Sequence, residues 1–108
     1  MSTDAPYAFV CSKSVSSERT VLVLRGDLDV LSAEEFRDCL NSALAGLAPL
    51  IELDFAGLSF IDARGVRELR QALSIVRDRG GDLVITSVPA MAYKVLELTG
   101  LTQMLSVE

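Results

Sequence analysis

Residues 59–66 read Ser-Phe-Ile-Asp-Ala-Arg-Gly-Val, and the spacing of apolar residues changes across this stretch. Before it, Leu50–Phe55 alternates apolar and polar residues, which is typical of a half-buried β-strand. After it, apolar residues recur at helical spacing through residues 66–76. The stretch therefore predicts a strand-to-helix junction, in which Asp62 stands where a residue that caps the helix N-terminus is expected.

Similar patterns predict the other strands and helices. Tyr7–Cys11 and Thr20–Leu24 follow one another directly, which favours an antiparallel hairpin because antiparallel strands need only a short connection. Later strands are separated by helices, which favours parallel pairing with right-handed crossovers. The expected strands are 7–11, 20–24 with a stop at Gly26, 50–55 with a break at 56–57, 82–86 and a short element at 104–107. We therefore expect one α/β domain over residues 1–108: a small mixed β-sheet with a leading antiparallel hairpin, then parallel βαβ units, covered by helices.

The predicted helices carry recognisable start and stop signals. Ser32 and Glu35 form a capping-box pattern, in which the serine hydroxyl accepts from the amide of Glu35 and the carboxylate reaches back. Apolar residues then continue at helical spacing as far as Leu47. The helix after Asp62 is expected to end at Gly80–Gly81, because glycine readily supplies the positive φ of a helix C-terminus.

Composition and charge exclude several classes of function. Half of the residues are hydrophobic and the formal net charge is −5, so the chain can form a core but lacks the positive charge that binds nucleic acid. Five of the ten basic residues are nevertheless arginines between positions 64 and 79. We interpret them as a solvated helix face, with a basic strip that faces an acidic partner as the alternative. The chain shows neither a signal-peptide pattern nor an apolar run near the ~20 residues of a membrane span, so we expect a cytoplasmic protein without membrane insertion.

The sequence lacks the residues of familiar enzyme sites. It contains no histidine, the usual general base of hydrolases, and its glycine pairs form neither common phosphate-binding pattern. Cys11 and Cys39 alone do not make a zinc-site pattern. We expect two buried, inert thiols, with a regulatory disulfide as the alternative. No enzyme activity, metal or cofactor is therefore expected.

Four stretches, taken together, match the pattern of one known family. Val21–Asp29 (VLVLRGDLD) matches an apolar strand that ends in G-[DE]-[LI]-D, and Leu53–Asp62 matches the strand that leads into a signature loop. Gly80–Ile85 matches the start of a later strand, and Val95–Leu101 matches the end of a late helix. In these features the chain resembles the bacterial STAS domain, the fold of anti-sigma factor antagonists and of the cytoplasmic tails of sulphate transporters. The matches follow the family's order over nearly the whole chain.

The resemblance implies a function and a missing group. In antagonists of this family, a serine follows the aspartate of an I-D-S-x-G signature, and an anti-sigma factor with serine kinase activity phosphorylates it. Residues 61–65 correspond to that signature, so Ala63 occupies the position of the serine. The resemblance implies an antagonist that binds a kinase-type anti-sigma factor and releases a sigma factor, without a phosphorylation switch. Arg64 is bulkier than the usual residue, and we expect it either to pair with Glu68 one turn later or to alter which partner fits.

The resemblance also places a partner-binding surface around the signature. Asp62 is expected to cap the helix, with partner contact as an additional role. Gly65 is expected where a side chain would clash, either in the first helical turn or at an interface. The aspartates at 27 and 29 suit a turn after a strand, or the docking face itself. The candidate partner-binding residues are Asp27, Asp29, Ser32, Ser59, Asp62, Ala63, Arg64, Gly65 and Arg67, and none is expected to be phosphorylated.

Two further functions remain as alternatives. STAS-like adaptor subunits of stress-sensing or lipid-transport complexes are also compatible with an alanine at this position. A receiver-type phosphoacceptor would gather Asp27, Asp29 and Asp54 around Mg²⁺, which prefers oxygen ligands. Against it, the chain opens with two consecutive strands and has no lysine after Gly100. The sequence does not specify an oligomeric state.

Overall fold

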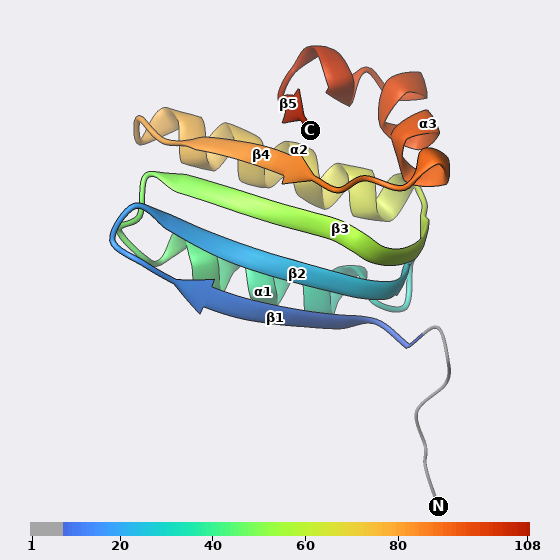
Figure 1. Cartoon of the computed structure of the whole chain (residues 1–108), viewed down its shortest axis with the longest axis horizontal. Helices are drawn as coiled ribbons and strands as arrows, with labels where there is room; N and C mark the ends of the chain where they lie inside the picture. Colours follow the sequence, from blue (N-terminus) through green and yellow to red (C-terminus); the bar gives the residue numbers. More distant parts are fainter. Residues whose placement is uncertain (1–7) are drawn as a thin grey trace, which may run out of the picture.

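Residues 8–108, the part of the chain that the computed structural model describes, form a mixed β-sheet with helices (Figure 1). The elements are β1 (Val10–Val15), β2 (Arg19–Leu28), α1 (Ala33–Leu44), β3 (Leu50–Ile61), α2 (Ala63–Asp78), β4 (Asp82–Thr86), α3 (Ala90–Leu98), the 3-10 helix η1 (Leu101–Gln103) and β5 (Ser106–Val107). The strands lie in the order β1-β2-β3-β4-β5. β1 is antiparallel to β2, and the remaining neighbours are parallel. The predicted fold class is confirmed.

The pattern of buried residues follows from the way the helices cover the sheet. Helices α1 and α2 lie behind the sheet in Figure 1, and α3 lies beside the far end of β4. In β2, Leu22, Leu24 and Leu28 are fully buried, whereas Val23 and Arg25 between them are exposed. Successive side chains of a strand point to opposite faces, so the leucines face the helices and the other residues face away from them.

The core fills the space between the sheet and the helices. Its largest fully buried side chains come from β2, β3, β4 and all three α-helices: Phe36, Phe55, Leu22, Leu24, Leu28, Ile51, Leu53, Ile61, Leu69, Leu83, Ile85 and Leu96. Burial of one such side chain contributes about 1.5–3 kcal/mol. Among residues 8–108, β1 supplies none of the buried hydrophobic side chains, and only its half-buried Cys11 packs against the core. None of the helices in this part of the chain has the length and apolar character that a bilayer span requires.

Two strands run further than the sequence pattern predicts. β2 continues through Gly26 to Leu28, and β3 continues through Gly57 to Ile61. The ladder between them shifts register at two places, between Val23 and Arg25 and between Gly26 and Asp27. Gly26 has a φ of 88°, and a Cβ on Gly57 would lie 2.5 Å from the Arg25 Cγ. The glycines therefore accommodate an irregular ladder rather than ending the strands, and the predicted stops were wrong.

The ends of two other elements also differ from expectation. The first strand is Val10–Val15 rather than 7–11, and Tyr7 lies outside the described residues. α1 ends at Leu44, so Leu47 follows the helix and its side chain is 98% exposed instead of continuing the apolar stripe. Gly80 does follow α2 with a φ of 84°, which confirms the predicted helix stop.

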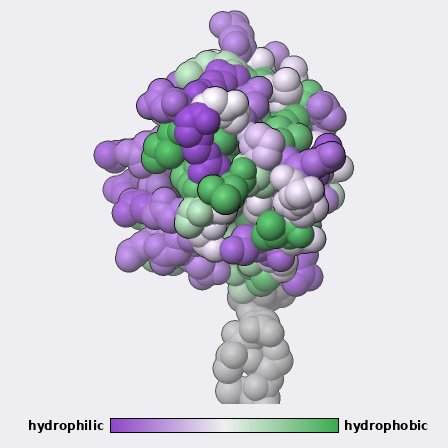
Figure 2. Space-filling model, turned by 90° about the vertical axis from the view of Figure 1, so that its left-hand side faces the viewer, coloured by the Kyte–Doolittle hydropathy of each residue, from purple (hydrophilic) through white to green (hydrophobic). Residues whose placement is uncertain are grey.

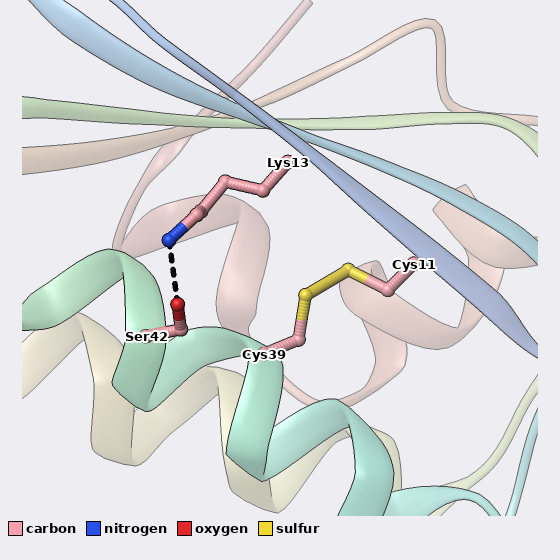
Figure 3. Close-up of a disulfide and its surroundings, with 4 residues drawn as sticks. All are labelled: Cys11, Lys13, Cys39 and Ser42. Carbon is pink, nitrogen blue, oxygen red and sulfur yellow. Dashed lines mark hydrogen bonds between the residues drawn. A yellow bond between two sulfur atoms is a disulfide. The ribbon is translucent and has the colours of Figure 1, made fainter.

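The two cysteines are joined in a disulfide, contrary to the expectation of inert thiols. Cys11 lies in β1 and Cys39 in α1, with a Cα–Cα distance of 6.8 Å. Figure 3 shows the bond running between the edge strand and the helix, next to a hydrogen bond from Lys13 Nζ to Ser42 Oγ. Helix α1 crosses behind the hairpin, and this crossing brings together residues 28 positions apart in the sequence.

The first turn of α2 packs tightly against the ends of β2 and β3. A Cβ on Gly65 would lie 2.7 Å from Leu28 Cγ and 3.0 Å from Ile61 Cγ1, both on buried side chains. This confirms that a side chain at position 65 would clash, and it places the clash inside the chain. Only glycine lets the helix come this close.

We expect Gly65→Ala to lower the free energy of unfolding by about 1–3 kcal/mol, because the added methyl overpacks a filled site. Chemical denaturation of both proteins measures the difference. In a Leu28→Ala background the same change should cost much less, since the space next to position 65 is then vacant. Equal losses in the two backgrounds would contradict the packing explanation.

Candidate functional site

Most of the candidate residues lie where β2 and β3 end side by side. Leu28 is opposite Ile61 in the parallel ladder, and the backbone N–H of Asp62 donates to the Leu28 carbonyl at 3.1 Å. The β2–α1 loop and the start of α2 are thereby held together at the right-hand end of the sheet in Figure 1. We call residues 27–32 and 59–67 the rim; they include all nine candidates.

On the β2–α1 side, Ser32 and Asp29 hold the loop in shape. The Ser32 hydroxyl donates to the Asp27 carbonyl at 2.7 Å and accepts from the Asp29 N–H at 3.0 Å. The Asp29 carboxylate accepts from the N–H groups of Leu31 and Ser32. Ser32 still occupies the N-cap position of α1, but its side chain forms no cap hydrogen bond with the helix. The capping box was therefore a wrong prediction, because the loop occupies the hydroxyl.

On the β3–α2 side, Asp62 caps the helix as predicted. Its Oδ1 accepts from the backbone N–H of Arg64 at 2.9 Å and of Gly65 at 3.5 Å. Ala63 is the first residue of α2 and its methyl is exposed. Ser59 is also exposed, near the end of β3. The signature position is thus a surface position, next to backbone amides that the cap already occupies.

Glu68 pairs with α1 and not with Arg64. Its side chain is almost buried and accepts two hydrogen bonds from Arg37, Nε to Oε1 and Nη2 to Oε2, both at 3.1 Å. This hydrogen-bonded carboxylate and its charge raise the pKa of Arg37. Of the two roles expected for Arg64, the structure contradicts the pair with Glu68, because Glu68 faces the neighbouring helix instead of the solvent.

The arginines of α2 mostly serve the chain itself. Arg70 donates to the Thr99 carbonyl, and Arg77 pairs with Asp82 at 3.2 Å. Arg79, directly after α2, donates to the carbonyls of Leu44, the last residue of α1, and of Gly46. Arg64 and Arg67 are exposed and form no ion pair within residues 8–108. Within residues 8–108, these two arginines without an ion pair both lie at the rim.

The rim also carries apolar side chains that were not among the candidate residues. Val30, Leu31 and Phe60 are 56%, 90% and 44% exposed. A hollow beside them is lined by Ala8, Phe9, Asp27, Asp29, Leu31, Ser32 and Glu35. The available signal was the Val30-Leu31 pair, which precedes the helix and has no place on its apolar stripe. Phe60 gave no signal, because strand alternation does not predict two neighbouring exposed residues.

The three aspartates of the receiver alternative do not converge. Asp54 lies opposite Val23 in the ladder, whereas Asp27 lies opposite Phe60, six residues further along β3. Six strand residues span about 20 Å. The Asp54 carboxylate accepts from the nearby Ala56 N–H at 2.9 Å. No group of three His, Cys, Asp or Glu side chains that could hold a metal ion occurs between residues 8 and 108.

We expect Asp62→Ala to lower the free energy of unfolding by about 1 kcal/mol, since it removes the side-chain acceptor at the start of α2. Asp62→Asn should retain most of the stability. Asp78→Ala is the matched control: it removes an exposed carboxylate from the other end of the same helix, where negative charge is unfavourable, and should cause no loss. Thermal and chemical denaturation give the comparison; equal losses for Asp62→Ala and Asp78→Ala would exclude the cap as the cause.

Comparisons with known proteins agree with this geometry. A family model described as "Mlab, STAS domain" matches residues 11–106. No match was found among curated proteins. A crystal structure of an anti-sigma factor antagonist from Mycobacterium paratuberculosis is similar, with a TM-score of 0.83, 15% identity and coverage of 95% of this chain and 87% of that chain.

The anti-sigma factor antagonist SpoIIAA is also similar, in two forms. The unphosphorylated form has a TM-score of 0.78 at 25% identity, and the match covers 94% of this chain and 88% of that chain. The phosphorylated form, from Bacillus, has a TM-score of 0.71 at 25% identity, covering 94% and 91%. Since the family model spans nearly all of the described sheet and helices, the chain belongs to the STAS domain family.

Proposed function

We propose that this protein is an anti-sigma factor antagonist, which binds an anti-sigma factor of the serine-kinase type in the cytoplasm and so releases a sigma factor. The observation that supports it most directly is the exposed rim, built on the residues that correspond to the antagonist signature. Similar folds carry this role in the antagonists from Mycobacterium paratuberculosis and in SpoIIAA. The protein acts here by binding, not by catalysis.

The composition of the rim suits contact with another protein. Leu31 and Phe60 provide exposed apolar surface, and carboxylates and arginines surround them. Protein interfaces combine an apolar centre with a polar edge in this way. Asp62 and the Ser32 network keep the loops in place, so little conformational entropy is lost when a partner binds.

Ala63 removes the phosphorylation switch in this proposal. A phosphoserine at a helix N-terminus carries a charge of about −1.5 to −2 at neutral pH. Here it would lie at the rim with the carboxylates of Asp27, Asp29 and Asp62, so the partner would meet strong local negative charge. A methyl group cannot accept phosphate. The rim therefore keeps its charge, and phosphorylation at this position does not control binding.

The decisive experiment compares the wild type with Ala63→Ser. Both are incubated with kinase-type anti-sigma factors of the same genome, with and without ATP, and phosphate incorporation and complex formation are measured. We expect the wild type to bind in both conditions without modification. Ala63→Ser should bind like the wild type without ATP, and with ATP it should become phosphorylated and lose affinity by at least about tenfold, equivalent to about 1.4 kcal/mol.

Each contrary result has a distinct meaning. Phosphate on wild-type Ser59 or Ser32 would show that the switch has moved and has not been lost. Absence of binding to every such anti-sigma factor, by both proteins and without ATP, would exclude the antagonist function itself.

Leu31→Asp should weaken the complex by at least about tenfold, because it places a charge in the apolar part of the rim. Leu47→Asp is the control, since Leu47 is even more exposed but lies in the α1–β3 loop at the opposite end of the sheet. Figure 2 shows that end, where apolar side chains are interspersed with hydrophilic ones. Binding measured by calorimetry should be unchanged in Leu47→Asp; equal losses in both variants would place the interface elsewhere.

An adaptor role is the second candidate, and the name of the matching family model favours it. That model is described as "Mlab, STAS domain" and not as an antagonist. An adaptor subunit of a stress-sensing or lipid-transport complex needs no phosphorylated serine, so Ala63 fits it equally well. Affinity purification from the source cells separates the two: an anti-sigma factor that co-purifies favours the antagonist, and transporter subunits favour the adaptor.

A further inference from the structure

The disulfide joins the least buried strand of the sheet to the helix layer. Five of the six residues of β1 are exposed, and β1 pairs only with β2. Cys11 is the half-buried exception, and its partner Cys39 in α1 is half-buried as well. The bond is thus near enough to the surface for a small reductant, and it fastens an edge strand that is held otherwise by its ladder with β2 and by the packing of Phe9 and Cys11 against the core.

Only weak interactions support the disulfide in holding β1 against α1. Lys13 Nζ donates to Ser42 Oγ at 2.6 Å, between two exposed residues (Figure 3). The rings of Phe9 and Phe36 meet edge to face, with centroids 6.0 Å apart. Exposed polar contacts and single aromatic pairs are each modest, so β1 should separate from α1 far more readily once the covalent bond is absent.

The segment that leads into β1 lines the hollow beside the rim. Ala8 and Phe9, which lead into β1, line the hollow together with Asp27, Asp29 and Leu31. Phe9 lies two residues before Cys11, and its ring partner Phe36 lies one helical turn before Cys39. The disulfide therefore adjoins the contact that sets the position of the hollow's outer wall.

We propose that Cys11 and Cys39 form a reversible redox site that clamps β1 to α1 when oxidised and releases β1 locally when reduced. Its reductant is a dithiol. One thiolate of the dithiol attacks a protein sulfur and breaks the S–S bond, which gives a mixed disulfide and one protein thiolate. The second thiol then displaces the other protein sulfur. Two electrons and two protons pass to the protein, which gains two thiols, while the dithiol becomes a disulfide.

A reversible redox role explains this disulfide better than a purely structural role does. The buried core already lies between β2, β3, β4 and the helices, so the fold does not need β1 to be fastened. In the reducing cytosol expected for this protein, disulfides that form are usually transient or redox-sensing. The redox state of the two cysteines thus determines how well ordered the edge strand β1 is. That the order of β1 also affects partner binding rests on the proposed function.

Hydrogen exchange of the whole chain tests the site without any partner. Exchange is followed by mass spectrometry in an oxidised sample, in one reduced with dithiothreitol, and in one reoxidised after reduction. We expect the amides of residues 10–15 to exchange at least about tenfold faster after reduction, those of β3 and β4 to stay unchanged, and reoxidation to restore protection. Thiol labelling should find two free thiols only in the reduced sample.

Two variants serve as controls. The double change Cys11→Ser and Cys39→Ser should exchange fast at residues 10–15 in every sample. Lys13→Ala loses the neighbouring hydrogen bond but keeps both sulfurs, so it should still respond to dithiothreitol.

Three results would overturn the proposal: a bond that resists excess dithiothreitol, a reduced chain with unchanged exchange in β1, or a loss of protection in β3 and β4 together with β1. Loss of protection in all three strands would show that the disulfide stabilises the whole fold and not β1 alone. Because no anti-sigma factor is present, none of these results depends on the antagonist function; the binding step is tested separately by comparing the affinity of the oxidised and reduced forms.

Discussion

The junction between β3 and α2 is the constraint on which the rest of the structure depends. Asp62 makes two of the contacts: its backbone N–H donates to the Leu28 carbonyl, and its side-chain carboxylate caps α2. Gly65 then lets α2 approach the buried ends of β2 and β3. The cap fixes the direction of α2, and the close packing fixes its distance from the sheet. Between them stands Ala63, which is exposed as the first residue of α2, so the position at which we propose that a phosphorylation switch is missing lies at the surface.

The proposed function depends on a similar division between side chains that hold the fold together and side chains that stay exposed. The Asp29 carboxylate and the Ser32 hydroxyl of the β2–α1 loop form backbone hydrogen bonds within the loop, in which Val30 and Leu31 are exposed to solvent. The arginines from position 64 to 79 are divided in the same way, since those further along bind the chain itself, whereas the first two form no ion pair within residues 8–108. What is left at the surface is a small area of mixed apolar and charged character, which suits the proposed binding role.

Local periodicity was enough to predict the order of the elements, the hairpin, the α2 cap and its stop at Gly80. It failed where an interaction from a distant part of the chain decides the outcome. Gly26 and Gly57 resembled strand ends because their role in a shifted ladder involves two strands at once. The partners of Ser32, Glu68 and the cysteines were missed for the same reason. Ser32 bonds to a loop carbonyl, Glu68 pairs with Arg37 on α1, and Cys11 is joined to Cys39 on the helix that crosses behind it. Phe60 could not be found by alternation, since the irregular ladder exposes two neighbours in a row.

The irregular ladder has a consequence for how such a domain diversifies. Because Leu58 and Ile61 must stay buried on either side of Ser59 and Phe60, the number of residues in this segment is fixed, whereas the identity of the two outer ones is not. Lineages can therefore exchange side chains at the exposed positions without disturbing the fold, but cannot add or delete one there. A domain of this kind would therefore acquire new partners by substitution at the two exposed positions. The number of residues in the segment and the path of its backbone would stay the same.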